Sequence, residues 1–292
     1  MPDVVPAAGN VAPAFERARS EGRSALVGYL PAGFPTADGA VDAIHAMIDA
    51  GVDLVEVGLP YSDPVMDGPT IQRAAEIALD RGTKTRDVLA TVAAVAGRSV
   101  PVLVMTYWNP VERYGVERFA RDLADAGGAG LITPDLPPDD AGDWLAASDQ
   151  HGLDRVFLVS PSSTDARIDI VAAACRGFLY ATAVMGVTGA RGAPSAAAPV
   201  LVQRVRARTD LPVAVGLGVS DGAQAATVAG FADAVIVGSA LVRRLLDADT
   251  VASGVAAVGR LAGELAVGVR SAGEGSAARS GTPPARSAVV QA

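Results

Sequence analysis

A glutamate inside an apolar run is the first residue in the sequence that could do chemistry. Glu56 is flanked by Val55 and Val57, in a segment whose composition predicts a buried β-strand. A carboxylate is costly to bury unless it is paired, hydrogen-bonded or kept protonated near neutral pH. Two interpretations of Glu56 therefore stay open: a strand residue bonded to a neighbouring loop, or a general acid/base at the end of a strand.

The segment after this strand supplies two more carboxyl groups. Asp63 and Asp67 lie in a loop, residues 60–69, that contains three prolines and a glycine. Prolines restrict the loop and can aim a side chain reproducibly. An aspartate in such a loop usually caps a turn. Beside a buried glutamate, one of the two could instead be a second catalytic carboxyl group, because carboxyl groups in different surroundings can hold different pKa values.

Glycines later in the chain indicate an anion site. Gly216 and Gly218 follow one apolar run, and Gly238 follows the next, with a short helix expected to begin at Ser239. Backbone N–H groups approach an anion closely where no side chain intervenes, and a helix points its positive end at it. A third glycine-rich segment, residues 185–192, is long enough to close over a ligand as a lid. These turns predict a phosphate site.

Short apolar runs alternate along the chain with Ala-rich segments of helical periodicity. The predicted strands are Ala25–Leu30, Asp53–Val57, Val100–Met105, Gly130–Ile132, Arg155–Val159, Gly177–Tyr180, Val213–Val215 and Ala234–Val237. The predicted helices are Thr36–Ala50, Thr83–Ala96, Val116–Ala126, Pro138–Gln150, Thr164–Ala173, Ser195–Arg208, Asp221–Ala229 and Asp249–Val267, with an extra helix at Ala12–Glu21 that closes the amino-terminal end. This order predicts a single (β/α)8 TIM barrel, whose active sites lie at the carboxyl ends of the strands. A doubly wound open sheet stays as the alternative, because its strands are also continuous apolar runs.

Length and composition set limits on the class of protein. The chain has 292 residues, and 50% of them are hydrophobic, which is enough for one large barrel. We expect residues 1–270 to form the barrel domain and residues 271–292, rich in Ser, Ala, Gly, Pro and Arg, to be a disordered tail. The net charge of -8 argues against nucleic-acid binding. The amino terminus does not resemble a secretory signal, and we expect a soluble cytoplasmic protein without membrane contact.

The scarcity of some residue types narrows the chemistry. The only cysteine is Cys175, the only lysine is Lys84, and the only histidines are His45 and His151. A metal site built from histidine and cysteine is therefore not expected, and one cysteine permits no internal disulfide. Lys84 lies in a turn-like run before a helix, which is not where a Schiff-base lysine would be needed. Proton transfer falls to carboxyl groups or to tyrosine.

The run from Glu56 to Gln72, EVGLPYSDPVMDGPTIQ, resembles the signature of the tryptophan synthase alpha chain family. Further matches follow in the family's order between about Ala12 and Val267: Gly28–Pro35, Met105–Pro110, Tyr114–Gly115, Pro134–Pro137, Gly186–Gly189 and the two glycine turns. The resemblance implies a TIM-barrel lyase of tryptophan biosynthesis that cleaves indole-3-glycerol phosphate into indole and glyceraldehyde 3-phosphate. It also implies a beta-chain partner in an alpha2beta2 heterotetramer. Pyridoxal phosphate is then expected in that partner, and no cofactor in this chain.

The resemblance also assigns roles to residues. It implies that Glu56 is the catalytic acid/base, that Asp67 contacts the indole N–H, and that Tyr180 supports the glutamate. The phosphate would be held by N–H groups at Gly189, Gly218, Gly238 and Ser239.

Residues around the site receive roles from the same resemblance. Asp63 and Pro64 match the loop that faces the beta chain, and Thr188 matches the lid threonine that contacts Asp67. Phe178 and the run Ala181–Met185 depart from the family's pattern, which affects the shape of the binding site more than the mechanism.

Other functions stay open on the sequence alone. Another phosphate-binding barrel lyase or isomerase would share the glycine turns but lack the pair Glu56 and Asp67. A stand-alone indole-3-glycerol-phosphate lyase would release free indole without a partner. A non-catalytic phosphate-binding partner subunit could keep the turns and lose either carboxyl group, whereas this chain has both.

Overall fold

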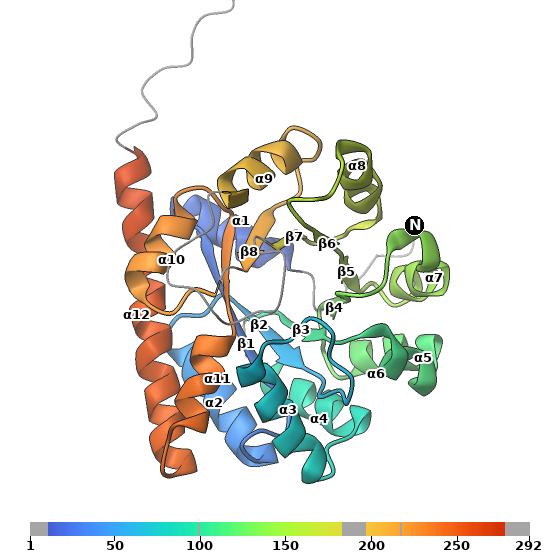
Figure 1. Cartoon of the computed structure of the whole chain (residues 1–292), viewed down its shortest axis with the longest axis vertical. Helices are drawn as coiled ribbons and strands as arrows, with labels where there is room; N and C mark the ends of the chain where they lie inside the picture. Colours follow the sequence, from blue (N-terminus) through green and yellow to red (C-terminus); the bar gives the residue numbers. More distant parts are fainter. Residues whose placement is uncertain (1–10, 99, 183–196, 217, 278–292) are drawn as a thin grey trace, which may run out of the picture.

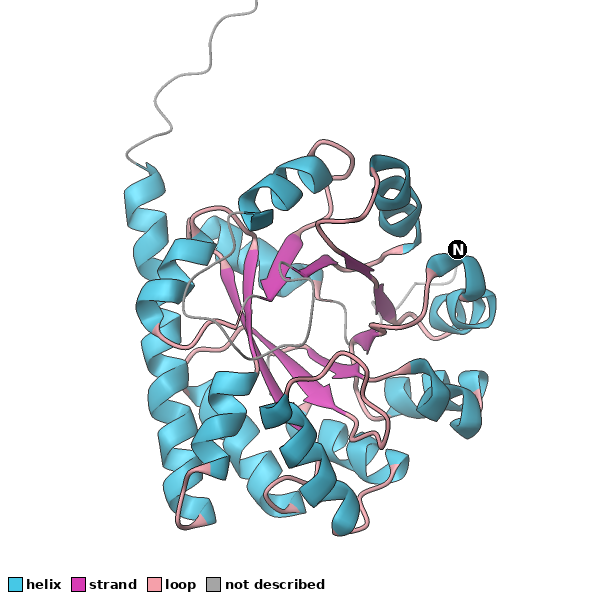
Figure 2. Ribbon diagram, in the orientation of Figure 1, coloured by secondary structure: helices cyan, strands magenta, loops and turns pink. Residues whose placement is uncertain are grey.

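Parallel β-strands form the centre of the molecule, and helices surround them (Figures 1 and 2). The computed structural model describes residues 11–98, 100–182, 197–216 and 218–277. Within these ranges nine strands form one sheet, in the order β5-β4-β3-β2-β1-β9-β8-β7-β6. The strands are β1 (Ala25–Pro31), β2 (Leu54–Gly58), β3 (Val102–Met105), β4 (Gly130–Ile132), β5 (Asp154–Val156), β6 (Leu158–Val159), β7 (Leu179–Thr182), β8 (Val213–Gly216) and β9 (Ala234–Val237).

The two ends of this sheet are consecutive in the chain, and this closes the barrel. Strands β5 and β6 are separated by Phe157 alone; β5 pairs with β4, and β6 pairs with β7. The backbone N–H of Tyr180 donates to the Phe157 carbonyl at 3.2 Å, so hydrogen bonding continues across the division. The predicted single strand Arg155–Val159 is therefore two short strands in one position of the barrel. The predicted TIM barrel is confirmed, and the open sheet is not observed.

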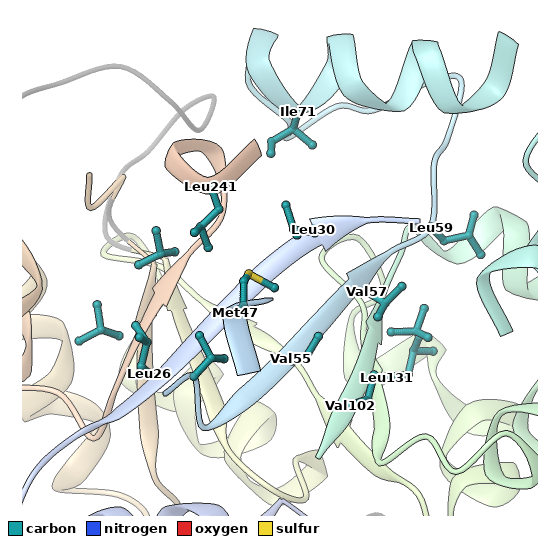
Figure 3. Packing of buried hydrophobic residues seen from close by; sticks show 14 of the residues in the cluster. Leu26, Leu30, Met47, Val55, Val57, Leu59, Ile71, Val102, Leu131 and Leu241 are labelled. Atoms are coloured by element: carbon teal, nitrogen blue, oxygen red, sulfur yellow. The ribbon is translucent and has the colours of Figure 1, made fainter. Parts of the chain in front are cut away.

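Alternation along each strand separates an inner layer from an outer layer of apolar side chains. The inner layer includes Ala25, Val27, Leu54, Leu103, Phe178, Ala214, Ala234 and Ile236. The outer layer includes Leu26, Leu30, Val55, Val57, Val102, Val104, Val213, Val215 and Val235. Figure 3 shows part of the outer layer around β1 and β2, where Met47 and Ile71 come from surrounding helices. Because Val55 and Val57 face outward, Glu56 between them faces into the barrel.

The amino-terminal end of the barrel is closed by helix α1 (Ala12–Ser20). Phe15 lies in the inner apolar layer, and its ring centroid is 5.6 Å from that of Phe178. The backbone N–H of Val11 donates to Oδ2 of the buried Asp154 at 2.9 Å, which anchors the start of the helix. The extra helix predicted at Ala12–Glu21 is confirmed in place and in function as a plug.

The remaining helices lie outside the strands. They are α2 (Ala37–Asp49), α3 (Pro69–Asp80), α4 (Thr85–Val95), α5 (Trp108–Tyr114), α6 (Val116–Asp125), the 3-10 helix η1 (Pro138–Asp140), α7 (Gly142–Gln150), α8 (Asp165–Ala174), α9 (Ala197–Arg206), α10 (Gly222–Ala229), α11 (Ser239–Leu246) and α12 (Val251–Ala277). Thr36, Thr164 and Asp221 cap the first turns of α2, α8 and α10 with their side-chain oxygens. Helices α3 and α5 were missing from the predicted list.

Helix α12 is longer than the sequence pattern predicted. Its buried residues Val258, Leu261, Leu265 and Val269 continue at helical spacing past the predicted end at Val267, and the helix runs to Ala277. Residues 271–277 are therefore helical, while residues 278–292 lie outside the described ranges. The division of the chain into a barrel domain and a tail stays a prediction.

The composition of α12 would also suit a membrane. The stretch Val251–Ala272 is long and apolar enough to span a bilayer by length and composition. Its buried side, however, packs on α2, α10 and α11. At Gly268 a Cβ atom would lie 2.2 Å from the carbonyl oxygen of Gly222, so α12 and α10 approach as closely as their backbones allow. This helix is a part of the barrel's outer layer.

Candidate active site

Glu56 is the most unusual buried group in the described part of the chain. It lies on β2, is 1% exposed, and neither carboxyl oxygen has a hydrogen-bond partner among the described residues. Burial raises its pKa from 4.5 to about 8. The carboxyl group is therefore mainly protonated at neutral pH and can donate a proton, which a strand glutamate tied to a neighbouring loop could not do as readily.

Two tyrosines lie over glycines beside this carboxyl group. Tyr29 is the strand partner of Glu56 in the β1–β2 register, and its hydroxyl oxygen lies 2.2 Å from where a Cβ atom of Gly58 would stand. The hydroxyl oxygen of Tyr180 on β7 likewise lies 2.5 Å from where a Cβ atom of Gly216 on β8 would stand. Each glycine is needed because any side chain in its place would collide with a ring.

Asp67 comes from the loop between β2 and α3. Its backbone carbonyl accepts a hydrogen bond from the side-chain amide of Gln72 at 2.9 Å. The backbone N–H of the preceding residue, Met66, donates to the Tyr107 hydroxyl at 2.9 Å. Burial raises the pKa of Asp67 to about 6, against a smaller lowering by a hydrogen bond from Tyr107. Asp67 is thus mainly ionised at neutral pH, where Glu56 is mainly protonated.

The two tyrosines interact electrostatically with both carboxyl groups. Burial raises the pKa values of Tyr29 and Tyr180 well above the ordinary value, and the negative charges of Asp67 and Glu56 raise both further. The fold therefore brings together Glu56, Asp67 and Tyr180, three residues singled out from the sequence.

The predicted phosphate positions are only partly described. Gly218 follows β8 with a φ of +68°, and Gly238 follows the adjacent β9 and precedes α11, which begins at Ser239 as predicted. N–H groups in the first turn of a helix have no partner within the helix and suit an anion. The Gly238 backbone also lies against the ring of Tyr29, so this turn borders the carboxyl cluster. Thr188 and Gly189 lie outside the described residues.

The loop that carries Asp67 also has an exposed portion. Asp63 is exposed and accepts a hydrogen bond from the Ser62 hydroxyl at 2.6 Å, Pro64 is half-buried, and Val65 is 75% exposed. This part of the loop therefore faces solvent at the carboxyl-terminal end of the barrel. The role of Asp63 and Pro64 in a partner contact stays a prediction.

Tyr29 and Tyr107 were not predicted as site residues. Tyr29 shares the inward-facing alternation of Ala25 and Val27, which would have placed it beside Glu56 once the pairing of the two strands was known. Tyr107 follows β3, and its ring centroid lies 5.4 Å from that of Tyr61. A tyrosine two residues after the end of a predicted barrel strand was the available indication for it.

Lys84, Cys175 and His151, which were also noted in the sequence, belong to other elements. Lys84 precedes α4, and Cys175 is buried at the end of α8, where burial raises the pKa of its thiol to about 12. His151 follows α7, with its Nε2 atom 2.7 Å from Glu117. In the described ranges no group of three His, Cys, Asp or Glu side chains is arranged to hold a metal ion.

Known proteins resemble the chain over most of its length. The family model described as "Tryptophan synthase alpha chain" matches residues 15–270. The tryptophan synthase alpha chain of Salinispora arenicola is 64% identical over 257 residues, which cover 88% of this chain and 96% of the relative. That of Mycobacterium avium is 58% identical over 263 residues, covering 90% of this chain and 95% of the relative.

Solved structures agree with the sequence matches. A structure of Mycobacterium tuberculosis tryptophan synthase superposes with a TM-score of 0.85 at 56% identity, covering 90% of this chain and 99% of that chain. The alpha subunit of Legionella pneumophila tryptophan synthase superposes with a TM-score of 0.80 at 31% identity, with coverage of 90% and 99%. From the family model, the relatives and the shared barrel together, the chain belongs to the tryptophan synthase alpha chain family.

Proposed function

We propose that this alpha chain cleaves indole-3-glycerol phosphate into indole and glyceraldehyde 3-phosphate. In this proposal Glu56 transfers protons and Asp67 stabilises the positive charge that develops on the indole ring. The observation that carries the proposal is the buried Glu56 carboxyl group, which has a pKa of about 8 and no partner among the described residues. Such a group is protonated at neutral pH and free to interact with a ligand.

The reaction breaks the bond between indole C3 and the first carbon of the glycerol chain. A proton reaches C3, and the ring becomes a cation whose positive charge is centred on the N–H. A proton then leaves the hydroxyl on the first chain carbon, the one bonded to C3, and a carbonyl forms at that carbon. The electron pair of the broken bond restores the neutral indole. Glu56 donates the first proton and, once ionised, accepts the second.

Asp67 stabilises the cation in this scheme. With a pKa of about 6 it is mainly ionised at neutral pH, and a carboxylate near the indole N–H lowers the energy of the positively charged state. Tyr180 supports Glu56 with a neutral hydroxyl, and the N–H groups at Gly218, Gly238 and Ser239 hold the phosphate. Gly189 and Thr188 complete the set on the evidence of the sequence alone. The scheme needs no cofactor in this chain.

A partner and a compartment follow from the family. We infer an alpha2beta2 assembly with a tryptophan synthase beta chain, which would hold pyridoxal phosphate, with Asp63 and Pro64 at the contact. The exposure of Asp63 supports this surface, because the loop is open to a partner at that position. A single cysteine agrees with a reducing cytoplasm. No observation favours a stand-alone lyase or a non-catalytic subunit.

The test is indole release from indole-3-glycerol phosphate by the purified chain, with and without a beta chain. We expect slow release alone and a sharp rise with the partner. Glu56→Gln should abolish release and keep the fold by circular dichroism, whereas Glu76→Gln, at an exposed glutamate of α3, should release indole at the original rate. Fast release without a partner would indicate a stand-alone lyase, and appreciable turnover by Glu56→Gln would refute the role of Glu56.

A further inference from the structure

The Tyr29 hydroxyl occupies the space that the side chain of residue 58 would fill. Glu56 and Gly58 are two residues apart on β2, so their side-chain directions point to the same, inner face of the barrel. An ideal Cβ on Gly58 would lie 2.2 Å from the Tyr29 hydroxyl oxygen and 2.6 Å from the ring carbon that carries it. The hydroxyl therefore lies next to Glu56, on the side toward the carboxyl end of β2.

The other side of the same ring borders the turn assigned to phosphate. An ideal Cβ on Gly238 would lie 3.2 Å from Cδ1 of Tyr29 and 3.4 Å from its Cβ. The strand order explains this position, because β1 lies between β2 and β9 in the sheet. Tyr29 thus extends from the start of α11 to the catalytic glutamate. Tyr180 does not have this position, since it lies over Gly216 on β8.

The hydroxyl of Tyr29 is free to bind a ligand. Within the described ranges the hydroxyls of Tyr29 and Tyr180 form no hydrogen bond with another residue, whereas the Tyr107, Tyr61 and Tyr114 hydroxyls are all hydrogen-bonded. The Tyr29 side chain is partly exposed at the carboxyl-terminal end of the barrel. Burial and neighbouring carboxylates keep the phenol neutral, so it can both donate and accept. An unused donor beside a catalytic carboxyl group needs a partner when the site is filled.

In the substrate, a three-carbon chain with two hydroxyl groups joins the indole ring to the phosphate. With the reacting carbon at Glu56 and the phosphate at Gly238, this chain must pass over Tyr29. We propose that the Tyr29 hydroxyl hydrogen-bonds the hydroxyl groups of the glycerol chain and selects phosphate esters that carry them. The proposal rests on the proposed function and adds to it a residue that determines specificity.

Binding measured without turnover tests this directly. In the Glu56→Gln background, calorimetry would give the Kd of indole-3-glycerol phosphate and of the same molecule with both chain hydroxyls replaced by hydrogen. Adding Tyr29→Phe should weaken binding of the substrate by about 3- to 10-fold, the range of one hydrogen bond between uncharged groups, and leave the dideoxy compound unchanged. Tyr61→Phe, which removes a hydroxyl bonded to Asn109, is the matched control and should change neither Kd.

Each outcome decides the proposal. Selective weakening of the substrate supports it. Equal weakening of both compounds would mean that the hydroxyl only maintains the shape of the site, and no weakening would mean that it has no contact with the chain; either result overturns the proposal and leaves the proposed function standing. If neither compound binds to Glu56→Gln, both the proposal and the proposed function fail.

Discussion

The hydroxyl oxygen of Tyr180 lies 2.5 Å from the point where a Cβ atom on Gly216 would stand, and two carbons of the Tyr180 ring lie 3.1 Å from the same point. Gly216→Ala must therefore displace the ring that lies beside Glu56. We expect kcat/KM for indole release to fall at least about tenfold, because one misplaced group in an active site commonly costs this much. Overpacking should also cost about 1–3 kcal/mol of unfolding free energy, measured with urea.

A matched glycine separates this effect from a general effect of alanine. Gly263 lies within α12 and has nothing within 4 Å of an added Cβ. Gly263→Ala should keep full activity and leave stability equal or slightly higher, since alanine favours helix. If Gly216→Ala were as active as Gly263→Ala, the close approach of Tyr180 would have no role in turnover.

The raised pKa of Glu56 should appear in the stability of the unliganded protein. Unfolding returns the pKa from about 8 to its ordinary 4.5, so the folded state holds a proton that the unfolded state has lost between these values. The stability that this proton provides is complete below about pH 4.5 and is lost as the pH rises toward 8. The Glu56→Gln variant has no carboxyl group at this position, so its stability does not have this pH dependence. The unfolding free energy of the original protein, minus that of the variant, should fall by about 1.4 kcal/mol per pH unit in this window.

Urea unfolding of both proteins at several pH values between 5 and 9, a range that includes the pKa of about 8, measures that difference. The titration of Asp67 contributes equally to both proteins and cancels. Parallel stability curves would show that Glu56 is solvated in the unliganded protein.

Catalysis should depend on pH through the same two groups. Asp67 must be ionised and Glu56 protonated, so kcat/KM should fall below about pH 6 and above about pH 8. The profile of kcat/KM reports these groups in the free enzyme. Asp67→Asn should lower activity and remove the acid limb. An acid limb that persists in Asp67→Asn would assign it to another residue.

An ion pair at the amino-terminal end of the barrel should contribute to stability. Arg23 binds both Asp53 oxygens, at 2.7 and 2.9 Å, and the two side chains are 5% and 6% exposed. Asp53 also accepts the N–H of Leu26. Asp53→Ala would leave the Arg23 guanidinium with Glu21 as its remaining carboxylate partner, at 2.6 Å, and should cost about 1–3 kcal/mol. Arg73→Ala, which breaks an exposed pair with Glu76, should cost less than about 0.5 kcal/mol in the same urea experiment.

The architecture was largely predictable because apolar runs and helical periodicity recur with the spacing of a barrel. The strands Gly130–Ile132 and Ala234–Val237 were predicted to the residue. The division of one strand at Phe157 was not, because no local residue type marks it and closure of the barrel determines it. Helix α3 was missed because it begins at Pro69, inside the segment that was interpreted as a loop carrying candidate catalytic aspartates.

Some residues of the candidate active site could be predicted from the sequence, and others could not. A glutamate in an apolar strand is conspicuous in sequence, and Glu56 is where that reasoning placed it. The pairing of a tyrosine with a glycine on the next strand depends on sheet register. Neither Tyr29 with Gly58 nor Tyr180 with Gly216 could be inferred before the strands were aligned.

Because helix α1 fills the amino-terminal end of the barrel, a ligand reaches the inner carboxyl groups from the carboxyl-terminal end of the strands. Phe15 and the inner apolar layer fill the amino-terminal end, so substrate and both products must cross the rim at the carboxyl-terminal end. That rim carries the loop with Asp63 and Val65. A protein bound at this rim would therefore affect both the arrival of the substrate and the departure of indole.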